Sequence, residues 1–296
     1  MDLVIFDRLR DDQRMYLRTE SNFSGFQDLK LYCQRWIPEK TRGQLIITHG
    51  HGEHSDSYQR VIDSLEGEGW SIFAWDWRGH GKSQGQRGFA HHFADYCYDF
   101  EAYFNFLLHN QALDPKVPIV LLGHSMGGLI QLRSLVSHPE WQVTSQVLSS
   151  PLLGVAIEVP AIKKLAAQVL QNFLPRLTLS SGILNSHLTR DSEVIREFER
   201  DVLRHDRICS GVYFGALESA QYVMSYPEKF KLPLLMQISD QDQVVSSAEG
   251  KKFFSALTCN KTLKIYSGNK HEVYNDLDRK IVLEDLKKYL SQFSKI

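Results

Sequence analysis

The sequence predicts an α/β fold built on a mostly parallel sheet flanked by helices. Short, continuously apolar runs such as QLIITHG, SIFAWDW and VPIVLLGHS alternate with segments of helical periodicity. Such runs are typical of strands buried on both faces, as in a parallel sheet covered by helices. With 296 residues, 43% of them hydrophobic and 23% charged, the chain is long enough to bury one large core.

The expected elements follow one another in a regular order. MYLRTESNF and LKLYCQRWI, separated by the turn-rich SGFQD, predict an antiparallel hairpin at the start of the sheet. Further strands are expected at QLIITHG, SIFAWDW, VPIVLLGHS, TSQVLSSPL, LPLLMQIS and KTLKIYSG. Helices are expected at YQRVIDSLEGEGW, HHFADYCYDFEAYFNFLLHN, GLIQLRSLVSHP, SSAEGKKFFSALT and DRKIVLEDLKKYLSQF.

The stretch from about 152 to 228 interrupts this alternation with helical signals alone. AIKKLAAQVLQNFLP spaces its apolar residues as one amphipathic stripe, and EVIREFERDVLRH and VYFGALESAQYVM follow it. We therefore expect a first part of the core at 1–151, a helical cap insertion at 152–228 and the second part of the core at 229–296.

Charge, cysteine spacing and hydropathy narrow the classes of function. The net charge is −1 and no run of basic residues occurs, so nucleic acid is not an expected partner. The four cysteines lack CxxC spacing and indicate free thiols in a reducing compartment. No stretch approaches the ~18 apolar residues of a membrane span, and the acidic N-terminus does not resemble a signal peptide. We expect a cytoplasmic protein, with attachment to a membrane surface left open.

LLGHSMGG, residues 121–128, places Ser125 between two glycines where an expected strand meets an expected helix. A tight turn there would hold the serine in a strained backbone conformation, and the glycines would let the turn close without Cβ clashes. The start of the helix would offer backbone N–H groups to a developing oxyanion. This context favours a nucleophile over the alternative, a serine in an ordinary strand-to-helix turn.

A serine nucleophile needs a base and an acid, which follow it in the order acid, then histidine, in this arrangement. Of the twelve histidines, only His271 lies after the last carboxylates that follow a strand, in the loop SGNKHEVYND. LPLLMQISDQDQVVSS offers Asp240 and Asp242. We favour Asp242, since two polar residues after the strand would bring its carboxylate round to the histidine, and expect Asp240 to be solvated.

The loop LIITHGHGEHS, residues 45–55, is the expected source of a second oxyanion donor. The N–H of His51 would act together with the N–H of Met126. The histidines of this loop, with Glu53, also raise the alternative of a metal site. Such a site would need further ligands from elsewhere and would leave Ser125 idle, so we expect neither a metal nor a cofactor.

HGHGEHSDSY, FAWDWRGHGKSQGQRG, LLGHSMGG and the His271 loop together closely resemble the monoacylglycerol lipase / lysophospholipase branch of the α/β-hydrolase fold. The resemblance spans about residues 20–290 and is weakest through 152–228. It implies a serine hydrolase without a cofactor, which cleaves monoacylglycerols or related single-chain lipid esters through an acyl-enzyme. The cap would line an apolar acyl tunnel and touch a membrane or micelle.

The resemblance also implies a role for each candidate site residue. These are Ser125 as nucleophile, Asp242 as acid, His271 as base, the N–H groups of His51 and Met126 as oxyanion hole, and Glu53 as a polar residue near the alcohol head. Three positions depart from the family pattern. Histidine at 51 replaces a small or aromatic residue, serine at 57 replaces a common arginine, and serine at 239 replaces a common glycine.

Other functions remain open on the same framework. The triad would also serve a lysophospholipase, a small-ester carboxylesterase, or an enzyme that cleaves carbon–carbon bonds or thioesters or performs perhydrolysis. A non-catalytic lipid-binding protein of this fold is a further alternative, although it predicts a broken triad. A membrane-interaction module would instead use the amphipathic AIKKLAAQVLQNFL.

Overall fold

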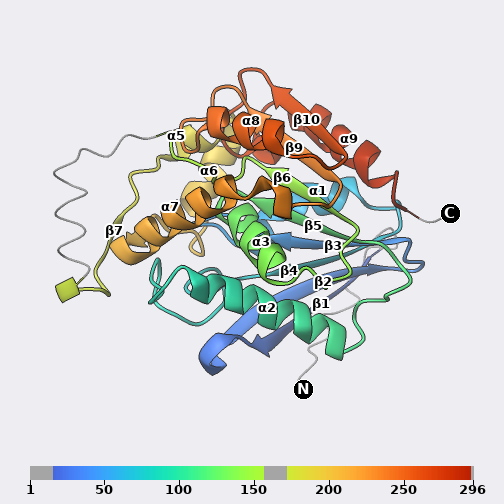
Figure 1. The fold of residues 1–296 in the computed structure, drawn as a ribbon, viewed down its shortest axis with the longest axis horizontal. Helices are drawn as coiled ribbons and strands as arrows, with labels where there is room; N and C mark the ends of the chain where they lie inside the picture. Colours follow the sequence, from blue (N-terminus) through green and yellow to red (C-terminus); the bar gives the residue numbers. More distant parts are fainter. Residues whose placement is uncertain (1–15, 157–171, 295–296) are drawn as a thin grey trace.

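The computed structural model describes residues 16–156 and 172–294, and an eight-stranded sheet runs through its centre (Figure 1). The strand order is β1-β2-β4-β3-β5-β6-β9-β10. The pairs β1·β2 and β2·β4 are antiparallel, and every other neighbouring pair in this sheet is parallel. The predictions of a mostly parallel sheet and of an N-terminal hairpin are therefore confirmed. Its strands are β1 (Tyr16–Ser24), β2 (Lys30–Pro38), β3 (Gly43–Thr48), β4 (Trp70–Trp75), β5 (Ile119–His124), β6 (Ser145–Ser149), β9 (Leu234–Ser239) and β10 (Lys261–Tyr266).

The central strands are buried along their whole length. Every residue of β3, β4, β5, β6 and β9 is buried. Their continuous apolar sequences predict this, because helices cover both faces of a parallel sheet. β10 lies at the edge, and all of its residues but the last are half-buried or exposed.

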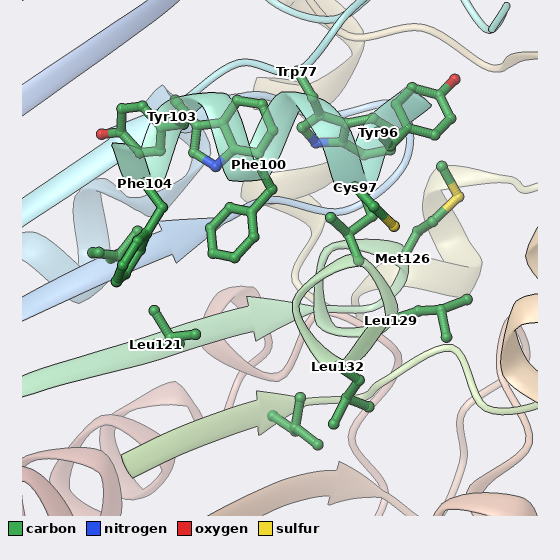
Figure 2. Packing of buried hydrophobic residues seen from close by; sticks show 14 of the residues in the cluster. Trp77, Tyr96, Cys97, Phe100, Tyr103, Phe104, Leu121, Met126, Leu129 and Leu132 are labelled. Carbon is green, nitrogen blue, oxygen red and sulfur yellow. The ribbon is translucent and has the colours of Figure 1, made fainter. Parts of the chain in front are cut away.

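Helices cover both faces of the sheet and enclose two apolar cores. One core packs α1 and α9 against strand residues that include Leu45 and Ile47. The other packs α2, α3 and α8 against the opposite face, to which Ile46 points because side chains alternate across a strand. Figure 2 shows this second core, in which Cys97 and Phe100 point from α2 toward α3. These helices are α1 (Gln59–Ser64), α2 (Ala94–His109), α3 (Met126–Ser137), α8 (Ser247–Ala256) and α9 (Arg279–Leu290).

Between β6 and β9 the chain leaves the sheet and returns to it. We call its described residues 172–228 the cap segment. Figure 1 shows α5, α6 and α7 gathered at one end of the sheet. The carboxyl ends of β3 and β5 lie at this same end of the sheet. Residues that follow these two strands line one cavity together with residues of the cap segment. Its elements are β7 (Thr178–Ser180), α5 (Asn185–Leu188), α6 (Ser192–Arg200), β8 (Arg207–Cys209) and α7 (Ser210–Ser225).

The expectation that residues 152–228 contain helical elements alone is wrong. β7 and β8 pair as a short antiparallel sheet, with Leu179 opposite Ile208. Three-residue strands are too short to show an alternating pattern in the sequence. One expected helix also ends early, since α6 stops at Arg200 within EVIREFERDVLRH.

Other expectations for this region lie beyond what is described. In the amphipathic stretch AIKKLAAQVLQNFLP, residues 161–171 fall outside the described residues. The division into 1–151, 152–228 and 229–296 stays a prediction. Within the described ranges, no helix combines the length and the apolar character needed to cross a bilayer.

Candidate active site

Ser125 occupies a strained turn between β5 and α3. Its φ is +50° and its ψ is −120°, in a region that residues with a Cβ rarely adopt, at a cost of about 1–3 kcal/mol. The flanking glycines are required by packing. A Cβ on Gly127 would collide with the carbonyl oxygens of Thr48 and His49, and a Cβ on Gly123 would collide with the backbone of Gly128. The sequence LLGHSMGG therefore forms the predicted elbow.

The backbone around Ser125 is held from both sides. Its N–H donates to the carbonyl of Ser149 at 2.9 Å, and its carbonyl accepts the N–H of Leu152 at 3.0 Å. Met126 begins α3, so its N–H has no acceptor within the helix and lies at the positive end of the helix dipole.

His271 and Asp242 form a buried pair. Nδ1 of His271 lies 2.7 Å from Oδ2 of Asp242, and the side chains are 4% and 1% exposed. The other carboxylate oxygen accepts the N–H groups of Val244 and Val245 at 2.8 and 2.9 Å. Asp240 is exposed and accepts the N–H of Gly268 instead. The structure thus brings Asp242, and not Asp240, to the histidine.

Each member of the His271–Asp242 pair shifts the pKa of the other in favour of the charged form. Burial works against the charged form of His271, but the carboxylates of Asp242, Glu272 and Glu53 together outweigh it and raise the pKa of the imidazole. Burial likewise works against the Asp242 carboxylate. The charge of His271, its hydrogen bond and the valine N–H groups outweigh that effect and lower the pKa of Asp242. Asp242 therefore stays ionised and holds the proton of the neutral imidazole on Nδ1.

Ser125 and His271 line the same cavity. Since Nδ1 of His271 contacts Asp242, Nε2 is the ring nitrogen that is available to Ser125. Within the described residues no hydrogen bond joins Ser125 to His271. Such bonds are often long before substrate binds.

Two cavities meet at Ser125. The first, which we call the polar cavity, has a volume of about 260 Å³ and contains charged groups from the cap segment and from the loops after the strands. The second, the apolar cavity, has a volume of about 110 Å³. The residues that line both are His51, Ser125, Ser181, Ile183 and Val244. The apolar cavity is also lined by Met126, Leu152, Val155, Ile208, Tyr213, Ala216, Leu217 and Val245.

The oxyanion-loop candidate, His51, is held next to Ser125. A Cβ on the preceding Gly50 would come within 3.3 Å of the Cβ of Ser125, so only glycine lets the loop approach this closely. The following Gly52 has φ +80° and faces the backbone of His205, whose N–H donates to its carbonyl at 3.0 Å. Burial lowers the pKa of the His51 imidazole to about 4, so this side chain is neutral.

Glu53 is buried in the wall of the polar cavity, where a polar residue near an alcohol head is expected. Its Oε1 accepts the N–H of Gly50 at 2.5 Å and the hydroxyl of Tyr58 at 2.8 Å. Burial and the neighbouring Glu272 raise the pKa of Glu53 to about 7, against the lowering effect of Arg204.

Two histidines of the oxyanion loop, His49 and His54, form contacts with other side chains. His49 contacts the indole N–H of Trp77 at 2.8 Å, and His54 contacts the carboxylate of Asp201 at 2.7 Å. In the part of the chain that is described, no three His, Cys, Asp or Glu side chains are grouped as ligands for a metal ion.

Sequence reasoning missed several groups of the polar cavity. Glu272 follows His271 directly, and this adjacency was an available signal. Arg204, Asp201 and His205 come from the cap segment, and no local pattern links them to loops far away in the sequence.

A strained serine after the fifth strand of a mostly parallel sheet, with an acid and a histidine after later strands, defines the α/β-hydrolase fold. The chain belongs to the Hydrolase_4 family, described as serine aminopeptidase S33, whose family model matches residues 39–278.

Three relatives illustrate this membership. Monoglyceride lipase from Mus musculus is 32% identical over 253 residues, which cover 83% of this chain and 81% of that protein. The crystal structure of Paleococcus ferrophilus monoacylglycerol lipase gives a TM-score of 0.79 at 27% identity and covers 89% of this chain and 99% of that one. An uncharacterized abhydrolase domain-containing protein from Dictyostelium discoideum is 28% identical over 249 residues, 83% of this chain, which spans 26% of that longer protein.

Proposed function

We propose that the protein is a carboxylic ester hydrolase that cleaves monoacylglycerols, or related single-chain lipid esters, to a fatty acid and an alcohol. The observation that carries the proposal is the meeting of an apolar and a polar cavity at Ser125. An ester of one acyl chain and a polar alcohol has the same division at its carbonyl carbon. The mouse and Paleococcus relatives, both named for monoacylglycerol hydrolysis, support this choice of substrate.

In the first step, His271 takes the proton of Ser125 while the serine oxygen attacks the ester carbonyl. The N–H groups of His51 and Met126 bind the oxyanion, an interaction that contributes about 3 kcal/mol per donor. His271 then protonates the leaving alcohol, which lies beside Glu53 in the polar cavity. Asp242 keeps the imidazole in the required tautomer and stabilises the imidazolium.

In the second step, a water molecule replaces the alcohol. His271 takes a proton from this water as it attacks the acyl-enzyme. When the tetrahedral intermediate collapses, His271 returns this proton to the oxygen of Ser125, and the fatty acid is released. No cofactor enters the scheme.

We further propose that the cap segment touches the lipid surface that supplies the substrate. Its exposed apolar side chains include Leu179, Leu184 and Val202, and Val202 is 91% exposed. Co-sedimentation with liposomes should survive Ser125→Ala, because this contact needs no catalysis. Loss of co-sedimentation in that variant would contradict the proposed contact, because Ser125→Ala leaves these exposed side chains in place. A cytoplasmic location, with attachment at such surfaces, stays a prediction.

The hydrolase proposal is tested by initial rates on a panel of substrates. The panel holds a long-chain monoacylglycerol, a lysophosphatidylcholine, a triacylglycerol, a short p-nitrophenyl ester and, because of the family's description, an aminoacyl p-nitroanilide. The monoacylglycerol should react fastest, and Ser125→Ala should abolish the reaction. Cleavage of the short ester alone would make the protein a small-ester carboxylesterase. The absence of any Ser125-dependent hydrolysis would favour a non-catalytic lipid-binding protein.

A further inference from the structure

Arg204 is a buried cation that the cap segment places in the polar cavity. It lies between α6 and β8, and its side chain is 10% exposed. Its Nη2 lies 2.5 Å from Oε1 of Glu272, and its Nη1 lies 3.9 Å from Oε2 of Glu53. Nη1 also lies 3.4 Å from the hydroxyl of Ser57.

The surroundings of Arg204 hold its guanidinium in place. The group lies over the ring of Phe198 at 3.7 Å from the ring centroid. The backbone is fixed on both sides of it, because its N–H donates to the carbonyl of Asp201 at 3.3 Å and the next N–H, of His205, donates to Gly52 at 3.0 Å. Burying a guanidinium is unfavourable unless it is paired, and here two buried carboxylates pair with it.

Arg204 sets the charge of the wall that faces a leaving alcohol. Glu53 and Glu272 are both buried, and each raises the pKa of His271. Burial works against the charge of Glu272, but Arg204, His124 and the hydrogen bond from Asn275 together outweigh it and lower the pKa of this carboxyl. Glu272 and Arg204 therefore form a pair of zero net charge, and Glu53, whose pKa is about 7, adds only part of a negative charge near neutral pH.

We propose that Arg204 is a positioning and specificity-determining residue, which keeps the buried wall of the polar cavity near electrical neutrality and so favours uncharged alcohols over cationic ones. This inference rests on the proposed function. Without Arg204 the two glutamates would leave the wall anionic, and an anionic wall attracts a cationic head group.

The first test compares two esters of the same fatty acid, a monoacylglycerol and an acylcholine, slightly above neutral pH. In Arg204→Met the ratio of kcat/KM for the acylcholine to that for the monoacylglycerol should rise about tenfold, the order expected when one buried charge near the head group is removed. Arg204→Lys keeps the charge and should leave the ratio within about twofold of wild type, although its single ammonium cannot bridge both carboxylates. If Arg204→Met does not fold, Arg204→Gln keeps a hydrogen-bonding group on a shorter, uncharged side chain and carries the same expectation.

The second readout is the pH profile. Arg204 offsets the charges of Glu53 and Glu272, both of which raise the pKa of His271, so its loss favours the protonated imidazole. The acid limb of kcat/KM in Arg204→Met should therefore move to higher pH by up to about one unit. A purely structural role would lower the rate without moving this limb.

The matched control is Arg279→Met. Arg279 pairs α9 with Asp191 of the cap segment at 2.7 Å, but it lines neither cavity. This variant should leave both the ratio and the acid limb unchanged.

A folded Arg204→Met or Arg204→Gln enzyme with the wild-type ratio and acid limb would overturn the role of Arg204 and leave the proposed function standing. A wild-type protein that hydrolyses neither ester would instead overturn the proposed function itself.

Discussion

The apolar and polar cavities share Ser125 but differ in what they offer a ligand. Among the described residues that line the apolar cavity, none is Asp, Glu, Lys or Arg. The polar cavity contains a buried arginine and two buried glutamates, with further carboxylates nearer the surface. Burial of apolar area is non-directional and discriminates weakly between acyl chains, whereas buried charges discriminate strongly between alcohols. The comparison suggests that this enzyme is selective mainly on its alcohol side.

The largest expected effect follows from removing the atom at which the two cavities meet. Ser125→Ala should lower kcat on a long-chain monoacylglycerol by about 10⁴-fold or more, because the variant lacks the hydroxyl proposed to form the acyl-enzyme. Equilibrium binding of a non-hydrolysable ether analogue should persist, since both cavities keep their walls. Loss of binding together with turnover would mean that the variant has disturbed the fold.

A slightly smaller loss is expected from Asp242→Asn. An amide in place of the carboxylate favours the wrong tautomer of His271 and should lower kcat by about 10³- to 10⁴-fold. Asp240→Asn is the matched control, because Asp240 is exposed and bonds Gly268, and its kcat should stay within about twofold of wild type. Equal losses in the two variants would contradict the assignment of the acid.

The separate roles of the two cavities can be tested by filling one cavity at a time. Leu217 lines only the apolar cavity and Leu188 lines only the polar one. Leu217→Trp should lower kcat/KM for long acyl chains by about 10- to 100-fold and spare a short-chain ester of glycerol. Leu188→Trp should instead penalise glycerol relative to methanol as the alcohol, at constant chain length. If both variants penalised the same part of the substrate, the assignment of the two cavities would be wrong.

The pH dependence of kcat/KM tests whether His271 is the catalytic base. In the proposed mechanism only the neutral imidazole of His271 can take the serine proton, and Asp242 raises the pKa of this imidazole above the ordinary 6.5. The logarithm of kcat/KM should therefore fall with a slope of about one below an apparent pKa somewhat above 6.5. The low activity of Asp242→Asn should show its acid limb at lower pH, because the amide cannot stabilise the imidazolium. An unmoved limb would mean that another group titrates.

The pKa shifts of His271 and Asp242 also determine the direction in which the free energy of unfolding changes with pH. The pKa of His271 is raised by folding, so its contribution is full below the unfolded value of about 6.5 and is lost as the pH rises through the folded pKa. The pKa of Asp242 is lowered, so its contribution is present above about 3.8 and is lost as the pH falls through the folded value. Denaturant unfolding of wild type and of Asp242→Asn over a pH range that extends below about 3.8 and above about 6.5 measures both contributions.

The smallest expected effect concerns the backbone strain at Ser125. Ser125→Gly removes the Cβ that makes φ +50° unfavourable, so the free energy of unfolding should rise by about 1 kcal/mol relative to Ser125→Ala. Chemical denaturation of the two inactive variants isolates this difference from catalysis. Equal stabilities would show that the turn is not strained.

The core of the fold and the proposed triad were predictable because their signals are local. Each central strand of the sheet has a short apolar run. Ser125, Asp242 and His271 lie one, three and five residues after the ends of β5, β9 and β10. The carboxyl ends of parallel strands meet at one edge of the sheet, so side chains that follow different strands come together there whatever their separation in the sequence. Asp242 could be preferred over Asp240 from its place in the loop alone.

The cap segment was predicted less well for a physical reason. β7 and β8 are too short to have a detectable period, and their pairing depends on how the rest of the segment docks. Arg204 gives no sequence signal of its own, because an isolated arginine in a polar stretch usually points to solvent.

The sequence by itself determined the sheet, the strained serine and the acid–histidine pair, because strand periodicity and the geometry of parallel strand ends leave few alternatives. Only the tertiary structure decided that two cavities of opposite character meet at Ser125, and that a guanidinium from the cap segment stands between Glu53 and Glu272. These features depend on long-range docking, in which buried charges find partners that no local pattern specifies.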